Sequence, residues 1–415
     1  MPEVPKCRVV ITGLGTVAPN TIGKENFWAA LIEGKSGIRR ITRFDPAPFP
    51  TQIAGEVDLD ISQFIEPKKA RRMDRTTHLA MAAAKLAFTD SRLGLAAYNP
   101  ERVGVILATT MAGKGFTLEE YENVYRTKGP MRINTFTAIA SFPDAAASCI
   151  SLEFGLKGPS FSLSTACSSS SDALSIARDL IQKGAVDTVI VGGSDAPLFA
   201  PVFSSFCVLR ALSKRNDTPQ TASRPFDRLR DGFVLSEGSG VLILENLEHA
   251  LKREAHIYGE ILGVSSTCDA CHITNPDPHG LQAERALRLA ISDAGITPQD
   301  IDYINAHGTS TPLNDKIETM VIKRIFGDRA TEIPISSTKS IIGHTIAAAG
   351  ALEICACLLA LEKGIIHPTI NQEVPDPECG LNYVPNKAIA ANPKIILKNS
   401  FGFGGKNAAL VIGKI

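Results

Sequence analysis

One of the nine cysteines, Cys167, lies where a reactive thiol is expected. Residues 158–166 alternate as in a β-strand, and the apolar side chains of Leu174, Ala177 and Ile181 then recur every three to four positions, as in a helix. Cys167 therefore lies at the start of a predicted helix, where free amides and the positive end of the dipole favour a thiolate. The same amides can hold a developing oxyanion.

The alternative is that Cys167 is a small buried apolar residue, as most free cysteines are. Its neighbours are alanine, threonine and a run of serines, which favour the reactive interpretation. Other cysteines lie within apolar runs and are expected to be core residues: Cys7, Cys149, Cys207, Cys355 and Cys357.

Two histidines lie where α/β proteins bind ligands. His307 follows a predicted buried strand at 301–306. His344 precedes an alanine-rich helix, at what we interpret as the corresponding place of a sister repeat. Two neutral imidazoles beside a thiol suit a reaction in which a carboxylate leaves as carbon dioxide and an enolate oxygen is stabilised. A core or capping role is the alternative, and we assign it to His78, His249, His256 and His367.

Two charged residues near the second histidine can support it. Lys339 can orient a histidine or tune its proton affinity. Glu353 lies in an otherwise apolar predicted helix, so it needs a buried partner if it faces inward.

The bulk composition is that of a globular α/β protein. The chain has 415 residues, 43 basic and 43 acidic side chains, a formal net charge of zero and 44% hydrophobic residues. This balance favours neither nucleic acid nor a membrane as a partner. Because the cysteines are scattered and no export leader or long apolar segment is visible, we expect a cytoplasmic protein with reduced thiols.

No metal site is expected. The close pairs Cys268/Cys271 and Cys355/Cys357 each lack a second matched pair or a correctly spaced histidine pair.

Strand and helix signals alternate, which predicts an α/β fold with parallel strands joined by helical crossovers. A helix ending at Asp90 and a strand at 103–107 are matched, about half a chain later, by a helix ending at Asp293 and a strand at 301–306. We interpret this as a duplication into lobes at 1–255, which carries the cysteine, and 256–415, which carries the two histidines. Chance similarity between two ordinary α/β units is the alternative.

Four short motifs occur together and in order. They are Ser-Thr-Ala-Cys at 164–167, Asn-Ala-His-Gly-Thr-Ser-Thr at 305–311, Lys339 with Gly-His at 343–344, and Asn-Ser-Phe-Gly-Phe-Gly-Gly at 399–405. Together they resemble a beta-ketoacyl-[acyl-carrier-protein] synthase of type I/II, KAS II-like, over nearly the whole chain. The resemblance implies a thiolase-like fold of two duplicated αβαβα lobes packed as one five-layered body, a homodimer, and a catalytic triad of Cys167, His307 and His344.

The resemblance also implies the reaction. An acyl group is transferred to Cys167, malonyl-acyl-carrier-protein is decarboxylated, and the carbanion attacks the acyl-cysteine to give 3-oxoacyl-acyl-carrier-protein in fatty acid elongation. No cofactor is tightly bound, because the phosphopantetheine arm arrives on the acyl carrier protein.

By position, the amides of Cys167 and Phe403 are implied to form the oxyanion hole, with Phe403 as the gate of the acyl pocket. Lys339 and Glu353 match the supporting network. Substrate contacts are expected from Met111 at the far end of the acyl pocket, from Thr309 and Thr311 at the phosphopantetheine arm, and from Phe401 and His272. A basic patch resembles the surface that receives an acidic carrier protein, although such a run is usually a solvated face: Lys68, Lys69, Arg71, Arg72 and Arg210.

Three departures from the family pattern concern the pathway. Asp172 follows a serine run where fatty acid enzymes have a histidine-containing sequence, which is reminiscent of polyketide ketosynthases. Lys406 replaces a threonine and Cys271 an aromatic residue. The acyl length therefore stays open, and a ketosynthase of a type II polyketide or polyene pathway is the alternative.

Two more distant alternatives fit the sequence less well. Gly13 and Gly15 follow a strand and mimic a dinucleotide fingerprint, which would suit an NAD-dependent oxidoreductase, but an acidic residue at the end of a second strand is missing. A non-catalytic partner subunit of a heterodimer would lack the cysteine, so Cys167 speaks against it.

Overall fold

The computed structural model describes residues 7–94 and 98–415, and its centre is a mixed β-sheet. Within these residues, eleven strands form the sheet, in the order β11-β10-β14-β15-β9-β1-β8-β7-β5-β6, with β2 beside β1. Their bounds are β1 Val9–Ala18, β2 Thr21–Ile22, β5 Val103–Ala108, β6 Ser160–Leu163, β7 Thr188–Asp195, β8 Gly238–Asn246, β9 Gly259–Cys268, β10 Tyr303–Asn305, β11 Ile335–Ser336, β14 Ile395–Gly402 and β15 Lys406–Gly413. Two small sheets pair β3 (Ile38–Arg40) with β4 (Ile53–Gly55), and β12 (Ile365–Ile366) with β13 (Ile389–Ala390).

The strand order repeats outward from the centre of the sheet. From β1 it runs β8, β7, β5, β6, and from β9 it runs β15, β14, β10, β11. The two central strands pair where Val10 and Ile11 lie opposite Glu260 and Gly259. This matched order supports the duplication predicted from the sequence, and the proposed boundary at 255/256 falls between α10 (Leu247–Lys252) and β9.

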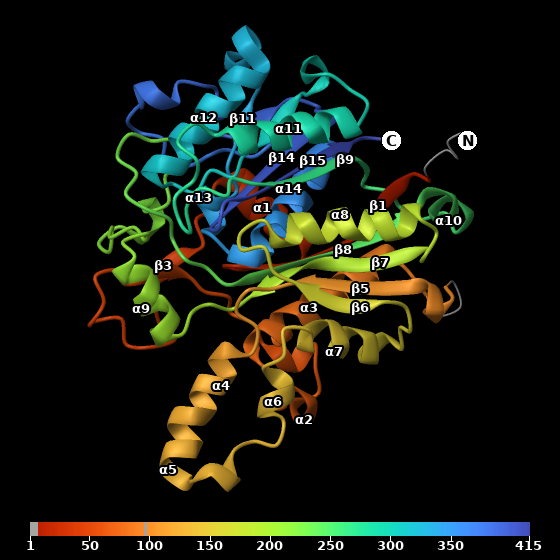
Figure 1. The fold of residues 1–415 in the computed structure, drawn as a ribbon, viewed down its shortest axis with the longest axis vertical. Helices are drawn as coiled ribbons and strands as arrows, with labels where there is room; N and C mark the ends of the chain where they lie inside the picture. The colour runs from red at the N-terminus through yellow and green to blue at the C-terminus, as the bar shows by residue number, and fades with distance from the viewer. Residues whose placement is uncertain (1–6, 95–97) are drawn as a thin grey trace.

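Helices cover both outer faces and fill the space between the two halves (Figure 1). Helices α3 (Arg75–Ser91) and α7 (Ala145–Phe154) cover the N-terminal half, while α11 (Leu281–Asp293) and α12 (Pro312–Phe326) cover the C-terminal half. Helices α8 (Ser169–Gln182) and α14 (Ala349–Lys363) form the middle layer and contact strands of both halves. The other helices are α1 Lys24–Glu33, α2 Pro67–Ala70, α4 Lys114–Glu120, α5 Arg126–Lys128, α6 Thr137–Ala140, α9 Ala200–Val208 and α13 Lys339–Ile342.

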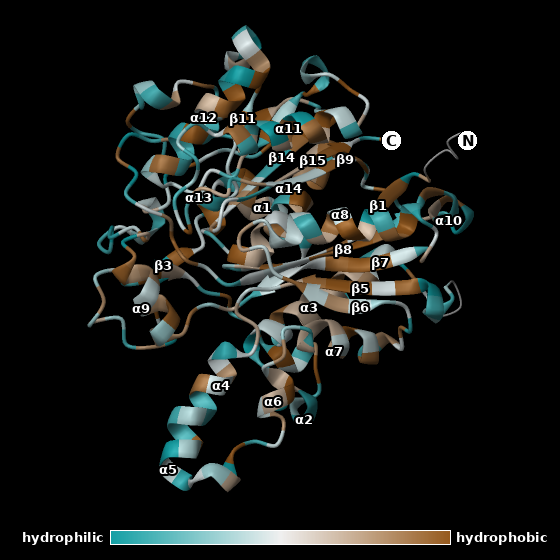
Figure 2. Cartoon of the chain, viewed as in Figure 1, coloured by the Kyte–Doolittle hydropathy of each residue, from teal (hydrophilic) through white to brown (hydrophobic). Residues whose placement is uncertain are grey.

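The largest hydrophobic cluster lies in this middle layer. It joins side chains of α8 and α14 to those of both halves of the sheet, and every residue of α14 from Ala349 to Leu361 is buried. Figure 2 shows the strands as largely hydrophobic, whereas α4 and α5 carry many hydrophilic residues. Because a fully buried Leu or Ile side chain contributes about 1.5–3 kcal/mol, the packing of this layer stabilises the contact between the two halves.

Gly13 and Gly15 have a packing role. Both lie within β1, which crosses closely over α3. A Cβ atom would lie 2.5 Å from the Ala87 carbonyl oxygen at Gly13 and 1.9 Å from the Ala83 carbonyl oxygen at Gly15. The glycines therefore allow a strand and a helix to approach, and they do not form the phosphate-binding turn that the dinucleotide alternative requires.

Two predictions from the pattern need correction. The sheet is mixed, since β1–β8, β7–β8 and β14–β15 are antiparallel, and only pairs such as β5–β7 and β10–β14 are parallel. The structural counterpart of His344, which follows β11 and precedes α14, is Cys167, which follows β6 and precedes α8. His307, after β10, corresponds instead to the loop after β5.

In residues 7–94 and 98–415, none of the helices has the length and apolarity needed to span a bilayer.

Candidate active site

The turn between β6 and α8 presents Cys167 to a cavity. Ala166, just before it, has a left-handed φ of 54°, a conformation that costs a non-glycine residue about 1–3 kcal/mol. The Ser169 hydroxyl donates to the Ala166 carbonyl at 2.5 Å, and the Ser168 hydroxyl donates to the Asp172 carboxylate at 2.9 Å. The serine run and Asp172 therefore hold the strained turn that exposes the sulfur to the cavity.

A cavity of about 440 Å³ opens at this turn, where loops following β5, β6, β10 and β14 converge. Most of the residues predicted from the sequence line it: Cys167, His307, His344, Met111, Thr309, Thr311, Phe401, Phe403 and Arg210. Its size and its largely apolar walls with few polar groups suit a small-molecule substrate.

His344 is the nearest imidazole to the nucleophile. Its Nε2 lies 3.1 Å from Cys167 Sγ, and its Nδ1 accepts a hydrogen bond from the Ile346 amide at 3.2 Å. Because Nδ1 is an acceptor, the proton of the neutral ring is on Nε2 and faces the sulfur.

His307 approaches the same space from the loop after β10. Its ring centroid lies 5.6 Å from that of His344, with the planes at 85°. Lys339 Nζ lies 3.3 Å from His307 Nδ1 and donates to the His307 carbonyl at 2.7 Å. An ammonium beside Nδ1 makes that atom an acceptor, so the proton of this ring is also on Nε2.

Both imidazoles are held neutral. Burial, followed by the Lys339 ammonium, lowers the pKa of His307 and of His344 well below the usual value. Two neutral Nε2–H donors beside one sulfur can stabilise a developing enolate oxygen without titrating near neutral pH.

The loop at 401–405 closes the cavity over the nucleophile. The Phe403 amide donates to the Cys167 sulfur, and the Phe401 ring centroid lies 5.8 Å from that of His307. A Cβ atom on Gly402 would lie 3.0 Å from the Cys167 amide nitrogen, so a larger residue would press on the amide expected in the oxyanion hole. The loop thus brings the Phe403 N–H group to the sulfur, beside the N–H group of Cys167 itself.

The predicted supporting pair lies beneath the histidines. Lys339 and Glu353 form a buried ion pair in which both side chains are 1% exposed. Glu353 thereby has the buried partner that its place in an apolar helix requires.

Comparison with known proteins agrees with this geometry. The family model "Beta-ketoacyl synthase, N-terminal domain" matches residues 6–250, and "Beta-ketoacyl synthase, C-terminal domain" matches residues 258–373. The chain belongs to the beta-ketoacyl synthase family. The thiolase-like α/β fold and the condensing-enzyme class predicted from the sequence are confirmed.

The proteins similar to this beta-ketoacyl synthase include 3-oxoacyl-[acyl-carrier-protein] synthases and a type II PKS ketosynthase. The 3-oxoacyl-[acyl-carrier-protein] synthase 2 of Synechocystis sp. is 44% identical over 415 residues, 100% of each chain, and that of Coxiella burnetii is 43% identical over 411 residues, 99% of each. Among solved structures, the AntDE:AntF complex, a type II PKS acyl-carrier protein with its ketosynthase, matches with 36% identity and a TM-score of 0.92. The ishigamide ketosynthase/chain length factor matches with 35% identity and a TM-score of 0.91, and each match covers 99% of this chain and 100% of the other.

The resting state of the nucleophile differs from the prediction. Burial, partly offset by the Lys339 ammonium and the Phe403 amide, raises the pKa of the Cys167 thiol to about 11. The loss of hydration therefore outweighs the helix terminus, and this beta-ketoacyl synthase carries a thiol at neutral pH. The proton leaves the sulfur as it attacks.

Alkylation of Cys167 in the resting synthase is expected to accelerate about tenfold per pH unit from pH 7 to pH 9, since the thiolate fraction rises tenfold per unit below the pKa. Iodoacetamide labelling followed by peptide mass spectrometry measures this rate separately from that of the exposed Cys268 and Cys271. A rate that levels off below pH 8 would contradict a resting thiol.

Two buried carboxylates that position the site were missed from the sequence. Glu318 on α12 accepts the backbone amides of His307 at 2.7 Å and Gly308 at 2.8 Å. Asp195, at the end of β7, accepts the amides of Met111 at 2.9 Å and Ala347 at 3.0 Å. An acidic residue among apolar helix positions, or at the end of an apolar strand, was the available signal. Lys398 was also missed, although a lysine within an apolar strand gives a similar signal; its side chain is buried.

His272 does not line the cavity, contrary to the prediction. It is exposed, and its Nδ1 accepts the backbone amides of Thr274 at 3.1 Å and Asn275 at 3.0 Å. Thr274 and Asn275 do line the cavity. His272 therefore shapes a wall loop and does not itself face the substrate space.

The predicted basic patch is divided in this chain. Arg210 lines the cavity and follows α9, whereas Lys68, Lys69, Arg71 and Arg72 lie in and after α2 and do not line the cavity. Lys69 pairs with Glu153 at 3.4 Å, and the Arg72 guanidinium lies 4.6 Å from the ring centroid of Phe136.

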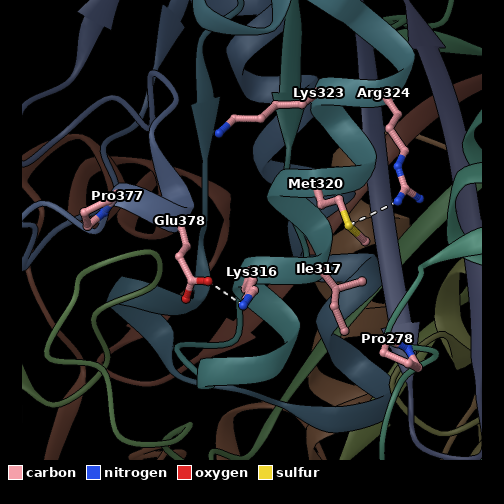
Figure 3. A pocket seen from close by; sticks show the side chains of 8 residues that line it. All are labelled: Pro278, Lys316, Ile317, Met320, Lys323, Arg324, Pro377 and Glu378. Atoms are coloured by element: carbon pink, nitrogen blue, oxygen red, sulfur yellow. Dashed lines mark hydrogen bonds and ion pairs between the residues drawn. The ribbon is translucent and has the colours of Figure 1, made fainter.

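A second depression, of about 480 Å³, lies along α12 (Figure 3). Two of its three basic side chains have partners within the chain, since Lys316 pairs with Glu378 and Arg324 donates to the His279 carbonyl at 2.6 Å. The triad lines the other cavity.

Proposed function

We propose that this beta-ketoacyl synthase joins an acyl thioester, held on Cys167, to malonyl-acyl-carrier-protein and releases 3-oxoacyl-acyl-carrier-protein in fatty acid elongation. The observation that carries the proposal is the contact of 3.1 Å between Cys167 Sγ and His344 Nε2, with the His307 ring 5.6 Å from the His344 ring in the same cavity. The full-length identity of 44% to a 3-oxoacyl-[acyl-carrier-protein] synthase 2 supports it.

In the first half-reaction, the Cys167 sulfur attacks the thioester carbonyl of the acyl donor. The oxyanion that forms accepts hydrogen bonds from the amides of Cys167 and Phe403. When the tetrahedral intermediate collapses, the donor's carbon–sulfur bond breaks. The thiolate of the phosphopantetheine arm leaves with the proton that Cys167 gave up, so charge is balanced.

In the second half-reaction, the bond between the malonyl carboxylate and its methylene carbon breaks and carbon dioxide leaves. The electron pair passes into an enolate whose oxygen accepts from Nε2–H of His307 and of His344. The enolate carbon attacks the acyl-cysteine carbonyl. Collapse then breaks the carbon–sulfur bond to Cys167, forms the 3-oxo group and releases the sulfur as a thiolate, which takes up a proton from water to restore the resting thiol.

The surrounding residues have proposed binding roles. Thr309 and Thr311, whose hydroxyls lie 2.9 Å apart, face the phosphopantetheine arm, and Met111 lies where the acyl chain ends. The carrier protein delivers the arm, and no tightly bound cofactor is needed. The basic patch steers the acidic carrier protein through Arg210 at the cavity and through the four basic residues in and after α2.

We also propose a cytoplasmic homodimer. Among the residues that the structure describes, β6 is an outer strand of the sheet, and its far edge pairs with no other strand. Large apolar side chains lie exposed after α5 and on α7, including Met131 at 92% and Leu152 at 82% exposure. A second copy pairing along β6 would cover them.

A polyketide ketosynthase is the second candidate, because two polyketide-type structures match with TM-scores of 0.92 and 0.91 and because Asp172 follows the serine run. The two candidates differ in what happens after one condensation. A fatty acid enzyme waits for reduction of the 3-oxo group, whereas a polyketide enzyme extends the unreduced chain.

Incubation with acyl-carrier-protein donors of graded length and excess malonyl-carrier-protein, without reductases, distinguishes them. The proposed function predicts a 3-oxoacyl product two carbons longer than the donor, detected by mass spectrometry of the carrier protein. Products that carry several unreduced oxo groups would support the polyketide candidate instead. The absence of any condensed product would contradict both.

A further inference from the structure

Lys398 is a fully buried lysine that the mechanism above does not use. It lies on β14, beside α14 of the middle layer (Figure 1), and its side chain is 0% exposed. Its Nζ lies 2.7 Å from Glu353 Oε2 and donates to the Asn399 carbonyl and the Ser400 hydroxyl. A buried ammonium is retained only where such partners offset its lost hydration.

Glu353 is shared between two ammonium groups. Its Oε1 accepts from Lys339, and its Oε2 faces Lys398. Burial and the Lys339 ammonium lower the pKa of Lys398, whereas the Glu353 carboxylate raises it. With both lysines protonated, two positive charges and one negative charge leave a surplus of one positive charge among side chains that are at most 1% exposed. Cys357 on α14 also faces this cluster, but burial raises the pKa of its thiol far above neutral, so it adds no negative charge. Water and salt screen such a buried charge poorly.

The surplus charge faces the two imidazoles. Lys339 Nζ lies 3.3 Å from His307 Nδ1, and the charges of both lysines lower the pKa of His307 and His344 below what burial alone would give. The nearest carboxylate on α12, Glu318, accepts the His307 backbone amide, and burial raises its pKa. The net charge close to the imidazoles therefore depends largely on the number of lysines that share Glu353.

We propose that Lys398 is a positioning residue for condensation. Because Lys398 shares Glu353 with Lys339, the positive charge of Lys339 is not fully compensated. This charge keeps both imidazoles neutral, with their Nε2 protons toward the cavity. The inference rests on the proposed roles of His307 and His344 and adds a residue to the predicted pair of Lys339 and Glu353. Without Lys398, Lys339 and Glu353 form a neutral pair and the imidazoles gain protons more readily. A protonated ring carries hydrogen on Nδ1, which conflicts with the Ile346 amide at His344 and with the Lys339 ammonium at His307.

The test is the pH profile of condensation from pH 5.5 to 8.5 for the full-length enzyme and for Lys398→Met, which keeps the length of the side chain and removes its charge. The unaltered enzyme is expected to keep its rate within about twofold between pH 8 and pH 6. Burial and Lys339 still lower the imidazole pKa in Lys398→Met, but the loss of one ammonium raises it toward the ordinary value, so the Lys398→Met rate should fall more than twofold over the same interval and further by pH 5.5. Lys387→Met, at an exposed lysine, is the matched control and should follow the unaltered profile.

The proposal would be overturned if the Lys398→Met rate differed from the unaltered rate by the same factor at every pH. A merely structural role lowers the rate without changing the shape of the pH profile. An unaltered enzyme that does not condense at any pH would instead contradict the proposed function. If Lys398→Met does not fold, Lys398→Gln replaces it. Nitrogen-15 NMR of histidines in the unaltered enzyme then serves as the second measurement: neutral Nε2–H signals for His307 and His344 at pH 6 are expected, and titration of either near pH 6.5 would overturn the inference.

Discussion

Replacing Cys167 by alanine is expected to abolish condensation, lowering the rate by about 10⁵-fold or more, because the acyl group then has no covalent acceptor. Decarboxylation of malonyl-carrier-protein should persist within about tenfold, since the donors on His307 and His344 remain. Mass spectrometry of the carrier-bound products measures both rates in one reaction.

Cys207→Ala is the matched control, since Cys207 is also 8% exposed and does not itself line the cavity. It should keep both activities. Condensation that survives in Cys167→Ala would remove the sulfur from the mechanism. Loss of decarboxylation together with condensation would contradict the division of the reaction between the sulfur and the imidazoles.

Replacing either histidine by alanine is expected to impair decarboxylation and condensation more than acyl transfer. His307→Ala and His344→Ala should each lower decarboxylation and condensation about 10²- to 10³-fold, because each removes one N–H donor to the enolate oxygen. Acyl transfer to Cys167 should persist more than condensation does. The loss of acyl transfer should be the larger one in His344→Ala, which removes the contact of 3.1 Å with the sulfur.

The rate of acyl-enzyme formation, followed by intact mass spectrometry, separates the two steps. His256→Ala, at a histidine that pairs with Glu362 on the surface, is the control and should change neither. An equal loss of acyl transfer and condensation in both variants would contradict the proposed roles.

The residues that carry the chemistry could be predicted because they interrupt their local pattern. Cys167 between a strand and a helix, His307 after a strand and the glycine-rich loop at 401–405 are each visible without tertiary information, and the structure gathers all of them around one cavity. The repeated order of elements likewise predicted two equivalent halves, which the strand order of the sheet reproduces.

What could not be predicted depends on contacts between distant segments. Lys398 and Glu353 meet only when β14 packs on α14, and Glu318 reaches the His307 amide only through the fold of α12. The thiol state of Cys167 depends on how completely the cavity removes water from the sulfur, which the helix start alone does not reveal. The position of His272 was predicted wrongly because the sequence does not show whether a loop side chain faces the cavity or folds back on its own turn, as the His272 ring does.

The central claim is that one sulfur, Cys167, carries the acyl group between the two half-reactions. Its most direct measurement is peptide mapping by mass spectrometry after incubation with an acyl-carrier-protein donor alone. We predict a single acyl thioester on the peptide that contains Cys167, which disappears when malonyl-carrier-protein is added and reappears in the 3-oxoacyl product. An acyl group on another of the nine cysteines, or an adduct that malonyl-carrier-protein does not discharge, would contradict the account.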